Sequence, residues 1–274
     1  AGRVALSRVP YNVDEALAAF ATTEQAILVG AKAPVAFFAY PGKPSSMLPP
    51  SCEVFEMAGR EVDLPAALAA LAEELGASAL TPRHAALSRP PLPQGALAPG
   101  AIFQALTALM PENAILCDES VSSGRNRFAP TAGAPAHDFL QLTGGSIGWG
   151  LGHAVGAAVA CPNRKVIVLQ ADGSGMYINQ ALWTQAREGL DVAAIVFANR
   201  KYAILHSEFK NVGAGAPGRN ASRMLNLDQP AIDWVSLARG MGVAGHRVDT
   251  AEGFARVLAE ALAGKGPHLI EAVI

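Results

Sequence analysis

The sequence predicts an α/β protein in which a mostly parallel sheet is flanked by helices on both faces, with a smaller, partial α/β domain before it. Short apolar runs alternate with amphipathic stretches through the carboxyl-terminal part of the 274-residue chain, a pattern typical of parallel strands joined by helices. Prolines concentrate in residues 81–98, which lack a sustained period and indicate a linker. We therefore predict a partial central α/β domain over 1–80, the linker over 81–98 and the main domain over 99–274.

The first part should contain only part of an α/β layer. Its hydrophobic periodicity predicts a helix over residues 12–21, an apolar strand over 25–31 and a second helix over 64–76, which Gly76 ends.

The main part alternates helices and strands from Pro99 onward, where proline opens the first helix. The predicted helices cover residues 99–111, 178–189, 232–242 and 250–266, and the glycine-rich segment 144–160 enters another. The predicted strands cover residues 114–120, 164–172, 192–199 and 268–274. The last helix has an apolar face that we assign to the core, made of Phe254, Val257, Leu258, Ala261 and Leu262.

Composition and charge exclude several classes of function. The chain is 51% hydrophobic and 16% charged, as in ordinary globular proteins, and its net charge of −2 gives no basic surface for nucleic acid or anionic membranes. No apolar stretch reaches the roughly 18–20 residues of a membrane span. The three cysteines fit no metal or disulfide pattern, which favours a cytoplasmic location. The first residues show neither an initiator methionine nor a signal-peptide pattern and indicate an internal fragment or processed chain.

Polar residues follow three of the predicted strands where each strand ends. They are Asp118–Ser120, Asp172–Ser174 and Asn199–Lys201. Ligands of parallel α/β sheets bind beyond the carboxyl ends of the strands, so these tips would form one binding site if their strands are neighbours.

The second and third tips together offer the ligands of a magnesium ion. Asp172 supplies a carboxylate and Asn199 an amide oxygen, the hard donors that magnesium takes beside phosphate oxygens. Gly173 and Gly175 would let the backbone approach a phosphate ahead of a helix predicted to begin near Tyr177. An Asp-Gly pair alone is also common in plain turns. The spacing of 199 − 172 = 27 residues, however, suits one strand–helix–strand excursion that returns to the same edge of the sheet.

The segment ADGSGMYINQALWTQAREGLDVAAIVFANRKYAIL contains both tips. It resembles the cofactor-binding motif of the thiamine-diphosphate-dependent family that contains acetolactate synthase and benzoylformate decarboxylase, a motif that begins GDG and ends with paired asparagines. GGSIGWGLGHAVGAA, IDWVSLARGMGV, GPHLIEAVI and the early ILVGAKAPVAFFAYPGKPSS are similar to other parts of the family. The chain departs from the family pattern at Ala171, Ala198 and Gly152, none of which is a presumed ligand. The resemblance covers nearly the whole chain but only about half of the family's own chain.

This resemblance implies a role for each matching position. Asp172 and Asn199 would bind magnesium through their side chains, and Lys201 through its carbonyl. The diphosphate would contact Gly173, Ser174, Tyr202, Val121 and Ser122. Ile147 would hold the cofactor in a bent shape, and the Gly145 carbonyl would accept a hydrogen bond from its aminopyrimidine.

Other polar positions are weaker candidates. Glu119 and His206 could take a catalytic part, although the resemblance gives Glu119 a supporting position. Leu205 and Glu208 would line the substrate pocket. Arg125 and Arg127 could meet an acidic substrate, but we expect them to lie in a solvated loop.

The resemblance implies a decarboxylase or carboligase, a lyase or transferase, that acts on 2-oxo acids with thiamine diphosphate and Mg²⁺ as a homo-oligomer. Nothing in the chain resembles the family's pyrimidine-binding domain, which carries the glutamate that activates the cofactor. We therefore expect the chain alone to be inactive and to need that domain, in cis or on another chain. One alternative is a non-catalytic cofactor-binding fragment or scaffold. Another is a Rossmann-type nucleotide binder, although no GxGxxG turn follows a strand.

Overall fold

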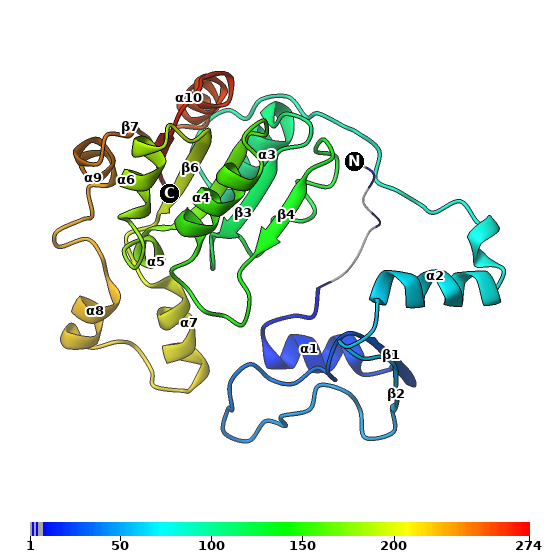
Figure 1. The fold of residues 1–274 in the computed structure, drawn as a ribbon. Coiled ribbons are helices and arrows are strands. Elements are labelled where there is room, and N and C mark those ends of the chain that lie inside the picture. Colours follow the sequence, from blue (N-terminus) through cyan, green and yellow to red (C-terminus); the bar gives the residue numbers. More distant parts are fainter. Residues whose placement is uncertain (1, 3, 5–7) are drawn as a thin grey trace. The chain divides into compact units, whose positions relative to one another are not determined.

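The structure is a computed structural model that describes residues 2, 4 and 8–274. The chain forms two compact units, one of Val4–Arg83 and one that contains His84–Ile274, and each is described by itself (Figure 1). Part of the proline-rich stretch belongs to the larger unit, where Leu97 is buried and the Gly95 N–H donates to the Glu252 carboxylate (2.9 Å). None of the helices in the described residues is long and apolar enough to cross a membrane.

The smaller unit contains a two-stranded parallel sheet with its helices. Its elements are α1 (Val13–Phe20), β1 (Gln25–Val29), β2 (Glu53–Ala58), α2 (Leu64–Glu74) and the 3-10 helix η1 (Ala77–Ala79). The side chain of Asn12 begins α1 by accepting two backbone N–H groups, and Asp63 begins α2 by accepting one. Both predicted helices and the predicted strand are confirmed, whereas β2 is absent from the sequence prediction.

The larger unit is built on a six-stranded sheet in which all neighbouring strands are parallel. Its strands are β3 (Ile115–Glu119), β4 (Asp138–Gln141), β5 (Val166–Ala171), β6 (Val192–Ala198), β7 (Ala244–Val248) and β8 (His268–Val273). Their order across the sheet is β4-β3-β5-β6-β8-β7. The predicted sheet is confirmed, and β3, β5 and β6 are consecutive neighbours. The three polar tips therefore meet at one edge of the sheet.

Helices cover both faces of this sheet (Figure 1). α3 (Pro99–Leu109) and α10 (Ala251–Ala263) pack on one face, and α4 (Gly150–Ala160), α6 (Ala181–Arg187) and α9 (Trp234–Gly240) pack on the other. Along β5, Ile167 and Leu169 join the first layer and Val166 and Val168 the second, the alternation of a strand buried on both sides. The predicted apolar face of α10 lies in the first layer, with Phe254, Val257, Leu258 and Ala261 buried and Leu262 half-buried.

Several elements are missing from the sequence prediction. They are β4, β7, α5 (Asp172–Gly175), α7 (Ala203–Asn211) and α8 (Arg219–Leu225). β4 and β7 are the two edge strands and expose polar side chains, so neither shows the apolar run of a central strand. The predicted helix over residues 178–189 is confirmed as α6, but it begins at Ala181 and not near Tyr177, because the single turn α5 already begins at Asp172 and successive turns lead from it to α6.

Gly175 packs tightly against Trp234, which is fully buried. A Cβ added at Gly175 would lie 2.6 Å from the indole ring, so we expect Gly175→Ala to lower the free energy of unfolding by about 1–3 kcal/mol. Gly156→Ala is the matched control, because its Cβ would meet open space within α4 and should raise stability by about 0.5–1 kcal/mol. Urea unfolding compares the two variants. Equal effects would contradict this packing.

Candidate functional site

The tips of β5 and β6 are joined by the carboxylate of Asp172, the first residue of α5. One carboxylate oxygen accepts the N–H of Gly173 (2.8 Å). The other accepts the N–H of Arg200 (2.6 Å), which follows Asn199 at the end of β6. The predicted return of the chain to the same edge of the sheet therefore brings the two tips into direct contact.

Asp172 is a buried carboxylate whose hydrogen-bond partners among the described residues are backbone N–H groups. Only 3% of its surface is exposed, and no ion pair among the described residues involves it. Burial raises the pKa of Asp172 to about 6, against the opposing effect of the Arg200 and Gly173 N–H groups. Because a buried charge is costly unless it is paired or binds a metal, a cation would complete this site.

Two further oxygens lie in the turn after β6. Asn199 Oδ1 accepts the Lys201 N–H (3.0 Å) and keeps a second lone pair. No backbone N–H of the described residues donates to the Lys201 carbonyl. Carboxylate, amide and carbonyl oxygens fit magnesium, which takes its remaining ligands from water and phosphate. The described part of the chain contains no cluster of three or more histidine, cysteine or acidic residues that could hold another kind of ion.

The turn after β6 is held in a strained conformation. Arg200 has a φ of 56°, in the left-handed region that non-glycine residues seldom adopt, and this conformation accompanies the contact of its N–H with Asp172. The segment 225–227 pairs with residues 200–202 and holds the turn from outside. Strain of this kind persists where the surrounding structure enforces it, typically at binding sites.

The candidate diphosphate contacts of the second tip lie beside Asp172. A Cβ added at Gly173 would lie 2.5 Å from the ring of Tyr202, so only glycine lets these two residues approach so closely. Ser174 is buried, and its hydroxyl accepts a hydrogen bond from Gln170 Nε2 (2.8 Å). Gln170 is missing from the sequence prediction, although a polar residue inside the apolar run of β5 is a signal that could have found it.

Val121 and Ser122 begin the loop that follows β3, next to the tip of β5. Val121 has a φ of 48°, which is unusual for a β-branched residue and indicates a loop held firmly in place.

A buried ion pair anchors this loop. Asp118 Oδ2 lies 2.9 Å from Arg127 Nε, and the two side chains are only 4% and 6% exposed. Arg127 also donates to the Gly124 carbonyl (2.8 Å), and its guanidinium lies over the rings of Phe128 and Phe139. The expectation that Arg127 lies in a solvated loop is therefore wrong. The sequence does not show that the chain turns back after Asp118 and brings the side chains of Asp118 and Arg127 together.

The glycine-rich loop between β4 and α4 carries the other two candidate cofactor contacts. Gly145 has a φ of 70°, and Ile147 is 41% exposed although its side chain is large and apolar. Glu119, at the tip of β3, accepts the three consecutive N–H groups of residues 148–150. Because Glu119 is only 1% exposed and fully engaged, its geometry favours a supporting position over direct contact with substrate.

The remaining weak candidates lie on α7. Leu205 is 45% exposed, and Glu208 is half-buried. His206 Nε2 lies 3.0 Å from Asn226 Oδ1, in the segment that holds the turn after β6, so it has a structural partner.

Elsewhere, burial raises the pKa of Cys117 on β3 to about 12, which excludes it as a thiolate nucleophile.

Fold and site together define a class of protein: a parallel α/β domain with oxygen donors for a cation and glycine turns at its strand tips. Residues 126–272, more than half of the chain, match the family described as "Thiamine pyrophosphate enzyme, C-terminal TPP binding domain". The chain belongs to this family of thiamine-pyrophosphate-dependent enzymes.

Relatives of the chain include decarboxylases and a synthase subunit. The putative acetolactate synthase large subunit IlvX of Mycobacterium tuberculosis is 47% identical over 277 residues, which cover 100% of this chain and 53% of that protein. Benzoylformate decarboxylase of Pseudomonas aeruginosa is 35% identical over 214 residues, covering 76% of this chain and 39% of that protein. The chain thus spans about half or less of the length of these relatives.

Among solved structures, the thiamine diphosphate-dependent 4-hydroxybenzoylformate decarboxylase of Rhodococcus jostii matches with a TM-score of 0.74 and 28% identity. The match covers 97% of this chain and 51% of that one. A putative thiamin diphosphate-dependent enzyme from Mycobacterium smegmatis, with a TM-score of 0.70 and 23% identity, shares the fold.

Proposed function

We propose that this chain binds thiamine diphosphate through a magnesium ion held by the side chains of Asp172 and Asn199 and the carbonyl of Lys201. The observation that carries the proposal is the buried carboxylate of Asp172, which forms no ion pair with any described residue and contacts the tip of β6. Membership of a thiamine-pyrophosphate family supports the choice of cofactor. The donor set supports the choice of metal, because magnesium prefers oxygen ligands and joins protein to phosphate.

The same edge of the sheet offers contacts for both ends of the cofactor. Gly173, Ser174 and Tyr202 from the second and third tips, with Val121 and Ser122 from the first, would contact the diphosphate. Ile147 would support the bent cofactor, and the Gly145 carbonyl would accept from the aminopyrimidine. The exposed side chain of Ile147 and the left-handed backbone of Gly145 support these roles.

The activity that fits best is decarboxylation or carboligation of 2-oxo acids. Thiamine diphosphate, when bound, supplies the electron sink that makes loss of carbon dioxide possible. The residues of this chain would bind and orient it, with Leu205 and Glu208 beside the substrate and His206 close by on α7. A pyrimidine-binding domain, in cis or on another chain, would complete the active site, and two subunits would assemble around it. The names of the relatives, an acetolactate synthase subunit and a benzoylformate decarboxylase, support this choice of reaction.

The test is the release of carbon dioxide from a panel of 2-oxo acids that includes pyruvate and benzoylformate. The chain alone should release none, whereas the chain joined to or mixed with a pyrimidine-binding domain should release it in the presence of Mg²⁺ and thiamine diphosphate. A correctly folded pair that binds the cofactor but turns over no 2-oxo acid would contradict the enzymatic proposal. That result would favour a cofactor-binding scaffold.

A further inference from the structure

We infer that Glu119 is a positioning residue that fixes the glycine-rich loop and so forms the wall for the aminopyrimidine half of the cofactor. The identity of the ligand rests on the proposed function. The role of Glu119 itself rests on its hydrogen bonds.

Glu119 reaches the amino terminus of α4 from the neighbouring strand. On β3 it follows Ile115 and Cys117 on the face that packs against α4, and as the last strand residue it lies level with the start of that helix. The first N–H groups of a helix have no partner inside the helix, and Trp149, which precedes α4, supplies no side-chain cap. Glu119 provides the missing acceptors. Its carboxylate takes the N–H groups of Gly148 (2.6 Å), Trp149 (2.8 Å) and Gly150.

The loop needs such an anchor because of its own composition. Gly144, Gly145 and Gly148 have φ values of 65°, 70° and 95°, a conformation that glycine adopts readily but at a high cost in chain entropy. Gly148 also passes close to Tyr177, whose Cβ would lie 2.8 Å from a Cβ added at Gly148. Two contacts therefore hold the end of the loop, one from β3 and one from the turn after α5. Ile147 directly precedes this anchored end.

The hydrogen bonds of Glu119 are separate from those of the magnesium site. Its three donors lie in residues 148–150, whereas the carboxylate of Asp172 bonds to Gly173 and Arg200. Substitution of Glu119 should therefore weaken binding of the aminopyrimidine end of the cofactor and leave binding of the diphosphate end unchanged. This separation distinguishes a positioning residue from one that merely stabilises the fold.

The experiment compares thiamine diphosphate with inorganic pyrophosphate, each with Mg²⁺, by calorimetric titration of the full chain. Glu119→Gln keeps the shape of the side chain but places an NH₂ group against the backbone N–H donors of residues 148–150. We expect Glu119→Gln to weaken thiamine diphosphate binding about 10- to 100-fold, by analogy with the loss seen when a residue that orients a metal ligand is removed, and to leave pyrophosphate binding unchanged. Glu119→Asp, which keeps the charge with a shorter reach, should recover part of the affinity.

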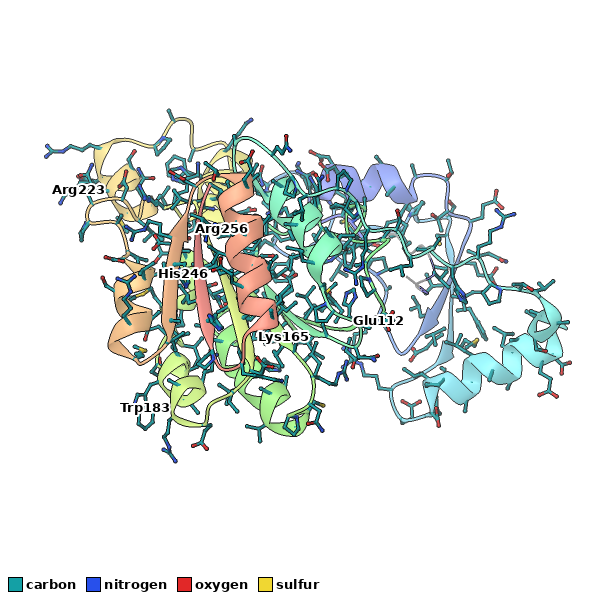
Figure 2. All side chains as sticks on the ribbon, turned by 90° about the horizontal axis from the view of Figure 1, so that it is seen from above. Glu112, Lys165, Trp183, Arg223, His246 and Arg256 are labelled. Carbon is teal, nitrogen blue, oxygen red and sulfur yellow. The ribbon has the colours of Figure 1, made fainter. Side chains whose placement is uncertain are left out.

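Glu112→Gln is the matched control, because it makes the same change of charge at an exposed residue that precedes β3, at the end of the sheet away from the strand tips (Figure 2). It should bind both ligands as the wild type does. Unchanged binding of thiamine diphosphate by Glu119→Gln, or equal weakening of both ligands, would overturn the inference. The proposed function fails separately, if the wild type binds neither ligand or if Asp172→Asn binds thiamine diphosphate normally.

Hydrogen exchange of the wild-type chain provides a second measurement that needs no variant. The amide protons of residues 148–150 should exchange as slowly as those of β3 and more slowly than those of residues 144–146. Exchange of residues 148–150 as fast as that of residues 144–146 would contradict the anchor, even if Glu119→Gln does not fold.

Discussion

Asp172→Asn is expected to abolish the magnesium-dependent binding of thiamine diphosphate. Removal of a residue that only orients a metal ligand costs about 10- to 100-fold in affinity, so loss of the charged ligand itself should cost at least about 100-fold. Calorimetric titration with thiamine diphosphate in Mg²⁺ measures the loss. Asp249→Asn, at an exposed aspartate after β7, is the control and should bind as the wild type does.

The same substitution should change the stability of the unliganded protein only slightly. Since burial raises the pKa of Asp172 to about 6, its charge costs about 3 kcal/mol at neutral pH, and asparagine removes that cost. The asparagine NH₂ group would, however, face the backbone N–H of Gly173 or Arg200, and two donors opposite each other cost about 1–3 kcal/mol. The melting temperature without ligand should stay within a few degrees of the wild type, while the increase caused by Mg²⁺ and thiamine diphosphate should vanish. Normal binding by a folded Asp172→Asn protein would show that this carboxylate is not the metal ligand.

Asp118→Ala is expected to give a large loss of stability, about 3–5 kcal/mol in the free energy of unfolding. The substitution leaves the charge of Arg127 buried without its carboxylate partner, and it releases the loop that begins with Val121 and Ser122. Urea unfolding measures the loss, and limited proteolysis of residues 120–127 reports the release of the loop.

The ion pair of Arg256 with Glu260 on α10 provides the comparison. Both side chains are largely exposed (67% and 56%), and Figure 2 shows Arg256 on this helix. Glu260→Ala should cost no more than about 0.5 kcal/mol, because water screens the pair. Similar small losses of stability in the two variants would mean that the buried ion pair of Asp118 with Arg127 stabilises the fold no more than an exposed pair does.

The strand tips could be predicted from sequence because the relevant signals are local. β6 is a continuous apolar run and β5 is interrupted only by Gln170, and each strand is followed directly by a residue with a hard oxygen donor, Asp172 after β5 and Asn199 after β6. Buried parallel strands show such runs, and their polar ends must lie at one edge of the sheet. The contact between Asp172 and Arg200 confirms that the two ends meet. The roles of these residues toward magnesium and the cofactor remain predictions.

The supports of the site could not be predicted, because they join residues that share no local pattern. Glu119 bonds to N–H groups some 30 positions along the chain, and these groups belong to backbone, so no residue type marks them. Arg127 lies in a polar stretch that indicates a solvated loop, yet tertiary packing buries it against Asp118 and two phenylalanines. The edge strands β4 and β7 were not predicted for a related reason. Their sequences lack an apolar run, and their strand conformation depends on pairing with β3 and β8.

The proposed magnesium site is tested most directly by a titration of the wild-type chain with thiamine diphosphate in the presence and absence of Mg²⁺, with NAD as the comparison ligand. We predict that thiamine diphosphate binds only when Mg²⁺ is present, that chelation of the metal reverses binding, and that NAD does not bind. Binding of thiamine diphosphate that is equally tight without the metal, or binding of NAD at the same site, would contradict a magnesium site at Asp172 and Asn199.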